Sequence, residues 1–394
     1  MSVTQITDDN IDTGIDTSKC IGAIGAMDGS ALTNMNAGTS LLKYGFNPAI
    51  DTNPVDGVGA IWINTVTGQM FSCTDATTDQ NTWTNMGSGT GHVTYTPPVT
   101  ESFGGIGGGT SSGYNSGGTE VTYIQKFSLT SNGNASHVGN LSVPRSKICG
   151  NSSTTHGYTS GGQSLAVTFM DTIDKFSFST HGTAGDVGNL PSHGQINPAS
   201  QTDGTASVGY ATAGTSAGGV VGIKSKFSFT TDGNSVTVGN ITVPRFHASG
   251  QSSPYKGYIS GGTNLTDIIE EFSFASNVDT FDVADLAIGR EYLAEHSSNT
   301  YGYVSGGYIL AYAQTASVEK FSFSNTVTVS SHGNLSATRV SNTGQSSVTD
   351  GYSTGGFTTA TLNIIDKFSF ATNTTANDIG NLQTEQSNCC GQQI

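Results

Sequence analysis

An aromatic motif recurs six times along the chain at nearly constant spacing, and it limits the possible folds more than any other feature. Each copy places a serine between two apolar residues, as in Lys175-Phe176-Ser177-Phe178. Successive copies lie 49, 51, 45, 49 and 47 residues apart. A period of this length is typical of a repeat protein in which every unit is one supersecondary structure. The first aromatics of the six copies are Phe127, Phe176, Phe227, Phe272, Phe321 and Phe368.

A second landmark follows each of these aromatics at a fixed distance. Twelve residues on lies a Gly-Asn pair, or Ala284-Asp285 in the fourth unit, and a Leu or Ile always comes next. One inserted residue would turn every side chain of a strand to its opposite face, so a constant interval indicates a fixed hairpin. We interpret the Gly-Asn pair as the turn of that hairpin.

The third landmark is a tyrosine followed closely by two glycines. The third unit departs from this pattern, with Ala213-Gly214 after Tyr210. Glycine pairs at this spacing favour a strand that ends in a tight turn. The other five units carry the pairs Gly117 and Gly118, Gly161 and Gly162, Gly261 and Gly262, Gly306 and Gly307, and Gly355 and Gly356.

Together the three landmarks divide every unit into four short strands, and four antiparallel strands in such a unit make one blade of a β-propeller. Alternation along the aromatic strand puts both rings on one face. Burial of each ring against the neighbouring blade then contributes ~1.5–3 kcal/mol. The sequence therefore predicts an all-β fold with a six-bladed β-propeller. An elongated β-solenoid is the open alternative.

The end of the chain supplies a strand that has no partner in its own unit. Counting eleven residues on from Gly380 reaches Gly391, the equivalent of Gly150, Gly250 and Gly344 in intact units. The first unit, which begins near Tyr114, lacks this strand. We therefore expect residues 384–394 to complete the first blade and to close a propeller that spans residues 113–394.

Charge and motif content exclude several function classes. A net charge of −15 repels nucleic acid and anionic membrane surfaces, and no apolar run is long enough for membrane insertion or a signal peptide. The five cysteines lack metal-ligand spacing, so we expect buried free thiols. No known catalytic, phosphate-binding or calcium-loop motif is present. We expect no catalytic residue, metal or cofactor, and a binding or structural protein rather than an enzyme.

The repeat resembles the Kelch repeat. Shared features are the glycine pair, an apolar-acidic-x-aromatic strand such as Ile173-Asp174-Lys175-Phe176, and an arginine six residues past the Gly-Asn pair. The resemblance implies a six-bladed Kelch-like β-propeller over residues 104–394. The family's tryptophan is missing from every unit, and Gly194 and Gln386 replace the arginine in two units. Some members of the wider fold are copper oxidases, but the histidines here fall at unrelated repeat positions. The arginines are Arg145, Arg245, Arg290 and Arg339.

Residues 1–99 lie outside the repeat and are expected to form a small β-rich module. Residues 59–86 predict a hairpin around Thr67-Gly68. This segment is similar to a short module of tail-fibre and other virion proteins of bacteriophages. The resemblance implies attachment to other virion proteins and a location on the virion, after assembly in the host cytoplasm. A Pro/Gly-rich linker is expected over residues 100–112.

The connections between the second and third strands vary most in length, and they are expected to share one propeller face with the Gly-Asn connections. Loops on a rigid scaffold commonly carry recognition. We expect Phe169, Tyr308, Tyr312 and Phe357 to bind a receptor, because aromatic rings offer flat apolar surfaces for a sugar or a protein.

The expected function is a phage tail fibre or appendage that binds a host-surface glycan or protein. The alternative is a purely structural virion component, such as a collar, baseplate or head-decoration subunit. Tail fibres are usually trimers, but the sequence has no heptad repeat that would support one.

Overall fold

The computed structural model describes residues 41–44, 47–65, 69–86, 92–93, 109–119, 121–167, 169–191, 194–324 and 326–394. Contacts divide the chain into two compact units, residues 1–101 and 102–394. Cys20, the predicted turn at Thr67-Gly68 and residues 100–108 of the predicted linker lie outside the described residues.

The N-terminal unit contains one five-stranded sheet with an aromatic core. Its first two strands pair in parallel and the others are antiparallel. The rings of Trp62 and Trp83 are buried with Phe71, and the two indole centroids lie 5.9 Å apart. The strands are β1 (Leu41–Tyr44), β2 (Ile61–Asn64), β3 (Met70–Asp75), β4 (Thr82–Asn85) and β5 (His92–Val93).

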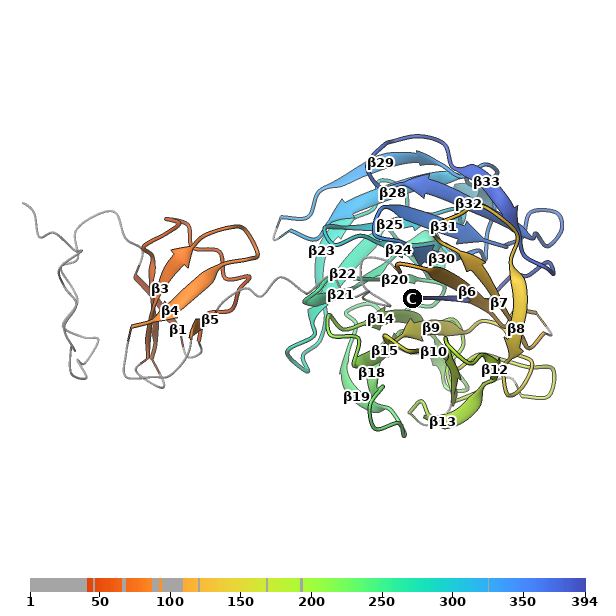
Figure 1. Cartoon of the computed structure of the whole chain (residues 1–394), viewed down its shortest axis with the longest axis horizontal. Coiled ribbons are helices and arrows are strands. Elements are labelled where there is room, and N and C mark those ends of the chain that lie inside the picture. The colour runs from red at the N-terminus through yellow and green to blue at the C-terminus, as the bar shows by residue number, and fades with distance from the viewer. Residues whose placement is uncertain are drawn as a thin grey trace, which may run out of the picture. The chain divides into compact units, whose positions relative to one another are not determined.

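The C-terminal unit is a propeller-like array of antiparallel four-stranded sheets (Figure 1). The first three sheets, from the innermost strand outward, are β34 (Cys390–Gln393), β6 (Ser112–Ser116), β7 (Tyr123–Ser128) and β8 (Ser136–Asn140); β9 (Cys149–Ser152), β10 (His156–Ser160), β11 (Thr172–Ser177) and β13 (Gly185–Asn189); and β14 (Ala199–Thr202), β15 (Val208–Thr212), β18 (Ile223–Ser228) and β19 (Val236–Asn240).

The next three sheets are β20 (Ser249–Ser252), β21 (Lys256–Ser260), β22 (Ile268–Ser273) and β23 (Phe281–Asp285); β24 (Ala294–Ser297), β25 (Tyr301–Ser305), β28 (Ser317–Ser322) and β29 (Val329–Asn334); and β30 (Thr343–Ser346), β31 (Asp350–Thr354), β32 (Ile364–Ser369) and β33 (Asn377–Asn381). Short additions are β12 (Gly182–Thr183), which runs beside β8, the pairs β16 (Thr215–Ser216) with β17 (Gly219–Val220) and β26 (Tyr308–Ile309) with β27 (Ala313–Gln314), and the 3₁₀ turns η4 (Thr263–Leu265) and η5 (Leu310–Tyr312).

The innermost strands contact one another in a cycle around the centre of this unit. In order, β9, β14, β20, β24, β30 and β34 each contact the next, and β34 contacts β9 again. Strand β34 comes from the end of the chain and pairs antiparallel with β6, which places Gln392 opposite Tyr114. The first sheet therefore combines the C-terminal strand β34 with β6, the first strand that the structure describes in this unit.

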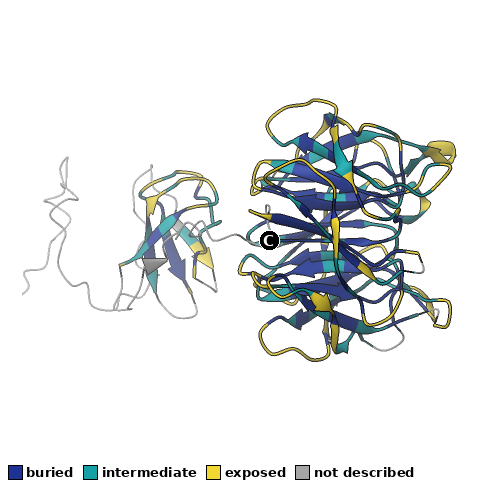
Figure 2. Ribbon diagram, turned by 45° about the vertical axis from the view of Figure 1, so that its right-hand side comes forward, coloured by how far each residue is buried: buried dark blue, intermediate teal, exposed yellow. Residues whose placement is uncertain are grey.

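Aromatic side chains fill the space between neighbouring sheets. Tyr158 of the second sheet stacks on Phe229 of the third, with ring centroids 4.4 Å apart, and lies 5.8 Å from Phe227. The junction between the sixth and first sheets repeats this contact, because Tyr352 lies 5.7 Å from Phe127. Phe176 and its five counterparts in the repeat are all buried, and the strands form the buried interior in Figure 2.

The Gly-Asn pairs are not turns, and this part of the sequence prediction was wrong. They end the outermost strands, beside a register shift that bulges the strand, as at Gly188-Asn189. The turn itself lies earlier, between β11 and β13. A Cβ at Gly188 would lie 2.1 Å from the carbonyl oxygen of Gly233 in the next sheet. Glycine is therefore required by close approach of the sheets, not by a turn.

The carbonyl of the asparagine in these pairs joins each outer strand to the next sheet. Asn140 accepts a hydrogen bond from the Ala184 N–H at 2.7 Å, and Asn381 accepts one from Ala135 at 2.8 Å. The second of these bonds joins the sixth sheet to the first. The junction between the sixth and first sheets therefore has the same backbone hydrogen bond as a junction between consecutive sheets.

Buried ion pairs link the arginines of the repeat to the acidic residues of the third strands. Arg145 lies 3.1 Å from Asp174, and both side chains are fully buried. Burial lowers the pKa of this arginine, and the nearby Asp174 opposes that shift. The other pairs are Arg245 with Glu270, Arg290 with Glu319 and Arg339 with Asp366. The two units without arginine also lack the acidic partner, having Gly194 with Ser225 and Gln386 with Gln125.

One junction contains a buried lysine where the other units have Ile or Val. The Lys224 ammonium donates to the Val278 carbonyl and lies 4.2 Å from the centre of the Phe272 ring. Burial lowers the pKa of Lys224 to about 8. The nearby Asp279 charge opposes this shift only in part, so the charged amine opposes folding at neutral pH.

Lys224→Ile should make the protein more stable at pH 7, by on the order of 1 kcal/mol. Its advantage should shrink as the pH rises from about 8 toward the lysine's ordinary pKa of about 10.4, because the unfolded wild type still binds a proton there and the folded one does not. Thermal unfolding at several pH values measures both effects. A variant less stable than wild type at pH 7 would refute this explanation.

Candidate functional site

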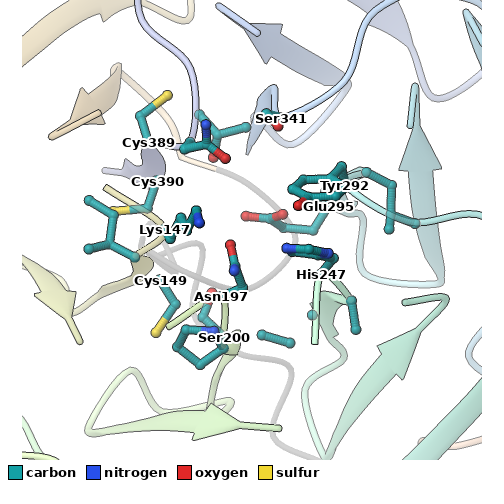
Figure 3. A pocket seen from close by; sticks show the side chains of 18 of the residues that line it. Lys147, Cys149, Asn197, Ser200, His247, Tyr292, Glu295, Ser341, Cys389 and Cys390 are labelled. Carbon is teal, nitrogen blue, oxygen red and sulfur yellow. The ribbon is translucent and has the colours of Figure 1, made fainter. Parts of the chain in front are cut away.

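Two kinds of connection share one face of the C-terminal unit. The segments that lead into the innermost strands form isolated bridges with the connections between second and third strands, as in Ser146 with Gln163 and Glu291 with Tyr308. We call this surface the loop face. Its centre is the mouth of a channel between the innermost strands, lined by residues from all the sheets (Figure 3).

Equivalent residues surround the channel mouth in an unusual backbone conformation. The N–H of Asn197 donates to the Lys147 carbonyl at 2.8 Å, and the N–H of Ser341 donates to the Tyr292 carbonyl at 2.9 Å, so that both residues bond to their counterparts in the preceding sheet. Positive φ angles cost roughly 1–3 kcal/mol for residues other than glycine, and they cluster at functional sites. The residues are Lys147, Asn197, His247, Tyr292, Ser341 and Asn388, with φ between 52° and 58°.

A row of aromatic rings extends from this mouth across the fourth and fifth sheets. His247 stacks on Tyr292 with ring centroids 3.4 Å apart, and Phe246 lies 4.3 Å from His247. Tyr308 follows Tyr292 at 5.9 Å, and Tyr312 follows Tyr308 at 6.0 Å. We call these five side chains the aromatic row. Its outer end is open to solvent, because Tyr312 is 69% exposed.

The row is uncharged near neutral pH. Burial lowers the pKa of His247 to about 3, with the Lys147 charge acting in the same direction, and burial raises the pKa of Tyr292 to about 12. The Glu291 carboxylate lies 3.7 Å from His247 Nδ1. Because His247 is neutral, this contact is not an ion pair. The surface can therefore offer apolar ring faces with few competing charges.

The structure brings together two of the four predicted receptor-binding residues. Tyr308 and Tyr312 belong to the aromatic row, on β26 and η5. Phe357 lies on the adjoining loop of the sixth sheet and is 37% exposed, and the Gln314 side chain links the two loops through the Thr358 carbonyl. Phe169 is half-buried on the connection between β10 and β11, in another sheet.

Sequence reasoning missed His247 and Tyr292, because the equivalent positions around the mouth carry different types of side chain and form no visible pattern. It also missed Glu295, for which a signal existed. Position eleven after the Gly-Asn pair is glycine in four units, but the fifth unit has Glu295, eleven residues after Ala284. In the structure Glu295 lies on β24 with its carboxylate pointing into the channel opening (Figure 3).

Glu295 lies between two cavities that together follow the channel. It lines both, as do Ser200 and Gly250. The glycines at this level are needed for close approach of the innermost strands, because a Cβ at Gly391 would lie 2.1 Å from the Gly344 carbonyl oxygen. Burial raises the pKa of Glu295 to about 8.

The cysteine thiols near the channel are buried, so we expect them to react slowly. Cys149, Cys389 and Cys390 are free, and burial raises the pKa of each. The described part of the chain holds no group of three or more His, Cys, Asp or Glu side chains arranged for a metal ion. None of its helices is long and apolar enough to cross a membrane.

Two comparisons with known proteins found no match. No model of a known protein family matches the chain, and no curated protein shows significant similarity to it. Function is therefore argued from the geometry of the loop face and the channel.

Proposed function

We propose that the C-terminal unit is a closed six-bladed Kelch-like β-propeller, each four-stranded sheet being one blade. Three observations support this proposal: the cyclic contacts of the innermost strands, the pairing of β34 with β6, and the backbone bond from Ala135 to Asn381 across the last junction. The buried arginine–carboxylate pairs occupy the positions at which the sequence resembles the Kelch repeat.

The function that follows is recognition by the loop face, in a bacteriophage tail fibre or similar appendage. The N-terminal unit attaches to other virion proteins, and the propeller binds a receptor on the host surface. The aromatic row is the observation that carries the proposal. Exposed aromatic rings beside polar loops are typical of surfaces that bind sugars, where ring faces contact the apolar faces of a pyranose. A host-surface glycan is therefore the favoured receptor.

The net charge of the chain limits which class of glycan the loop face is expected to bind. A net charge of −15 opposes a polyanionic glycan, and the row itself contributes no cation because His247 is neutral. A neutral or amino-substituted glycan fits both observations.

Tyr312→Ala should weaken binding at least tenfold, because removal of a well-packed aromatic contact typically costs more than about 1.4 kcal/mol. The full-length protein, fluorescently labelled, would be titrated onto host cells and onto an array of bacterial glycans. Phe281→Ala is the matched control, since Phe281 is 58% exposed on the outermost strand β23, away from the row.

Equal binding by Tyr312→Ala and wild type would exclude the aromatic row as the receptor site. Absence of binding by the wild type, with the loop face covered by another protein in imaged particles, would favour the second candidate. That candidate is a purely structural collar, baseplate or head-decoration subunit.

A further inference from the structure

The side chains around the mouth of the channel carry hydrogen-bonding groups that the fold itself does not use. They come from different sheets and line one opening, and Figure 3 shows Asn197 and Tyr292 pointing toward its centre. Free polar groups that converge on a concave surface are typical of a ligand site. Among the residues that the structure describes, four half-buried side chains at the mouth have no hydrogen-bond partner: Asn197, Tyr292, Ser341 and Asn388.

The opposite end of the channel differs, because its hydroxyl groups accept hydrogen bonds from neighbouring sheets. The N–H of Ser252 donates to Ser297 Oγ at 3.1 Å, and the N–H of Ser297 donates to Ser346 Oγ at 3.0 Å. Gln393 donates in the same way to Ser152 Oγ at 3.0 Å. Those hydroxyls stabilise the contacts between sheets, whereas the side chains at the mouth remain available to a molecule that enters it.

The backbone holds the side chains at the mouth in position before a ligand binds. The N–H of Lys147 donates to the Asn388 carbonyl at 2.8 Å, and the N–H of Asn388 donates to the Ser341 carbonyl at 3.0 Å. The N–H of Tyr292 donates to the His247 carbonyl at 3.1 Å. A site that is held in place by such bonds loses little conformational freedom on binding, which favours affinity for a small ligand.

One side of the mouth is aromatic and the rest is polar. The stacked rings of His247 and Tyr292 belong both to the mouth and to the aromatic row. We propose that the mouth is the end subsite of the glycan site. The terminal sugar contacts these two rings, and the amides and hydroxyls around the mouth bind its hydroxyl groups. This inference rests on the proposed function and adds which part of the glycan is recognised.

The direction of the aromatic row is the reason for assigning a terminal sugar. The row leaves the mouth toward Tyr308 and Tyr312, on the fifth sheet. A sugar within a chain has two linkages and would need a path on both sides of the mouth. The remaining positions around the mouth carry no aromatic ring that could continue the row: Lys147, Asn197, Ser341 and Asn388. The rest of the glycan therefore lies along the row on one side.

The charges near the mouth indicate an uncharged sugar. The Lys147 ammonium also lines the opening, and its hydrogen-bond contact with Gln163 is long, at 3.5 Å. An amino group on the terminal sugar would meet this positive charge. The net charge of −15 opposes acidic glycans, as argued above. The expected sugar is therefore a neutral hexose or an N-acylated hexosamine.

The test is direct binding of methyl glycosides to the full chain, measured by saturation-transfer NMR. The neutral probes are the methyl glycosides of glucose, galactose, mannose, N-acetylglucosamine and N-acetylgalactosamine, and the charged probe is that of glucuronic acid. At least one neutral glycoside should bind the wild type. Asn197→Gly should weaken its binding at least about fivefold, because the sugar loses a hydrogen bond.

The substitution by glycine is chosen so that the variant folds. Glycine adopts the φ of 52° at position 197 without strain, and the backbone N–H that bonds to Lys147 is kept. Ala206→Gly is the matched control. It makes the same kind of backbone change at a φ of 50°, in the turn between β14 and β15, and should bind the glycoside as wild type does.

Three results would overturn the end subsite: no binding of any neutral glycoside, equal binding by Asn197→Gly and wild type, or binding of the glucuronide alone. The receptor proposal fails by different results. Glycoside binding that depends on Asn197, in a protein that does not bind host cells, would reject the receptor role and keep the sugar site. Host-cell binding that is lost in Tyr312→Ala, without any glycoside binding, would reject the end subsite alone.

Discussion

A protein without its last eight residues, Ser387–Ile394, should lose the cooperative unfolding transition of the C-terminal unit or melt more than about 10 °C lower. The deletion removes β34, whose residues pair with β6 from Cys390 opposite Ser116 to Gln393 opposite Gly113. It also removes the buried Gln392 amide, which donates to the Tyr158 carbonyl at 3.1 Å. The innermost strands β9 and β30, which lie on either side of β34, would lose their contacts with it.

Calorimetry of wild type and truncated protein measures this effect, and a synthetic peptide of residues 387–394 provides the control. If the missing strand is the cause, added peptide should raise the melting temperature with its concentration, because it binds only the folded state. Equal melting temperatures for the two proteins would show that the C-terminal strand does not hold the ring closed.

The second large effect concerns a buried ion pair. Arg339→Gln should cost about 3–5 kcal/mol of stability, because it leaves the Asp366 carboxylate buried without its partner. Both side chains are fully buried in the wild type. The arginine also donates to the Gly355 carbonyl at the end of β31, so part of the loss comes from that bond.

The chain itself offers the matched control for this experiment. The first sheet has Gln386 and Gln125 where others have arginine and a carboxylate. The double variant Arg339→Gln, Asp366→Gln should therefore recover more than half of the stability that the single variant loses, as chemical denaturation would show. A double variant as unstable as the single one would mean that the unpaired carboxylate is not the cause.

Much of the fold follows from intervals in the sequence, because close-packed repeats tolerate few insertions. The nearly constant spacing of Phe176 and its counterparts marks the third strand of each sheet, and counting from Gly380 to Gly391 locates the strand that pairs with β6. The Gly-Asn pairs were misassigned for a physical reason. Glycine favours turns, but it also fits where two backbones approach closely, and sequence alone does not distinguish the two.

The candidate site was less predictable than the fold. Tyr308 and Tyr312 could be chosen because they are aromatic residues in a variable connection. Their partners His247 and Tyr292 could not, because the left-handed conformation at the channel mouth is imposed by bonds between sheets and is shared by lysine, asparagine and serine. The third unit shows again that the fold can impose this conformation on a residue other than glycine. Ala213 replaces the first glycine of the pair and has a φ of 63°, like the glycines at the equivalent positions.

A density map of the full-length protein, viewed along the channel, tests the closed propeller most directly. It should show six radial sheets of four strands, with residues 390–393 beside residues 113–116 and the Tyr352 ring against Phe127. A map with another number of sheets around the axis, or with the C-terminal strand outside the first sheet, would contradict the proposed ring.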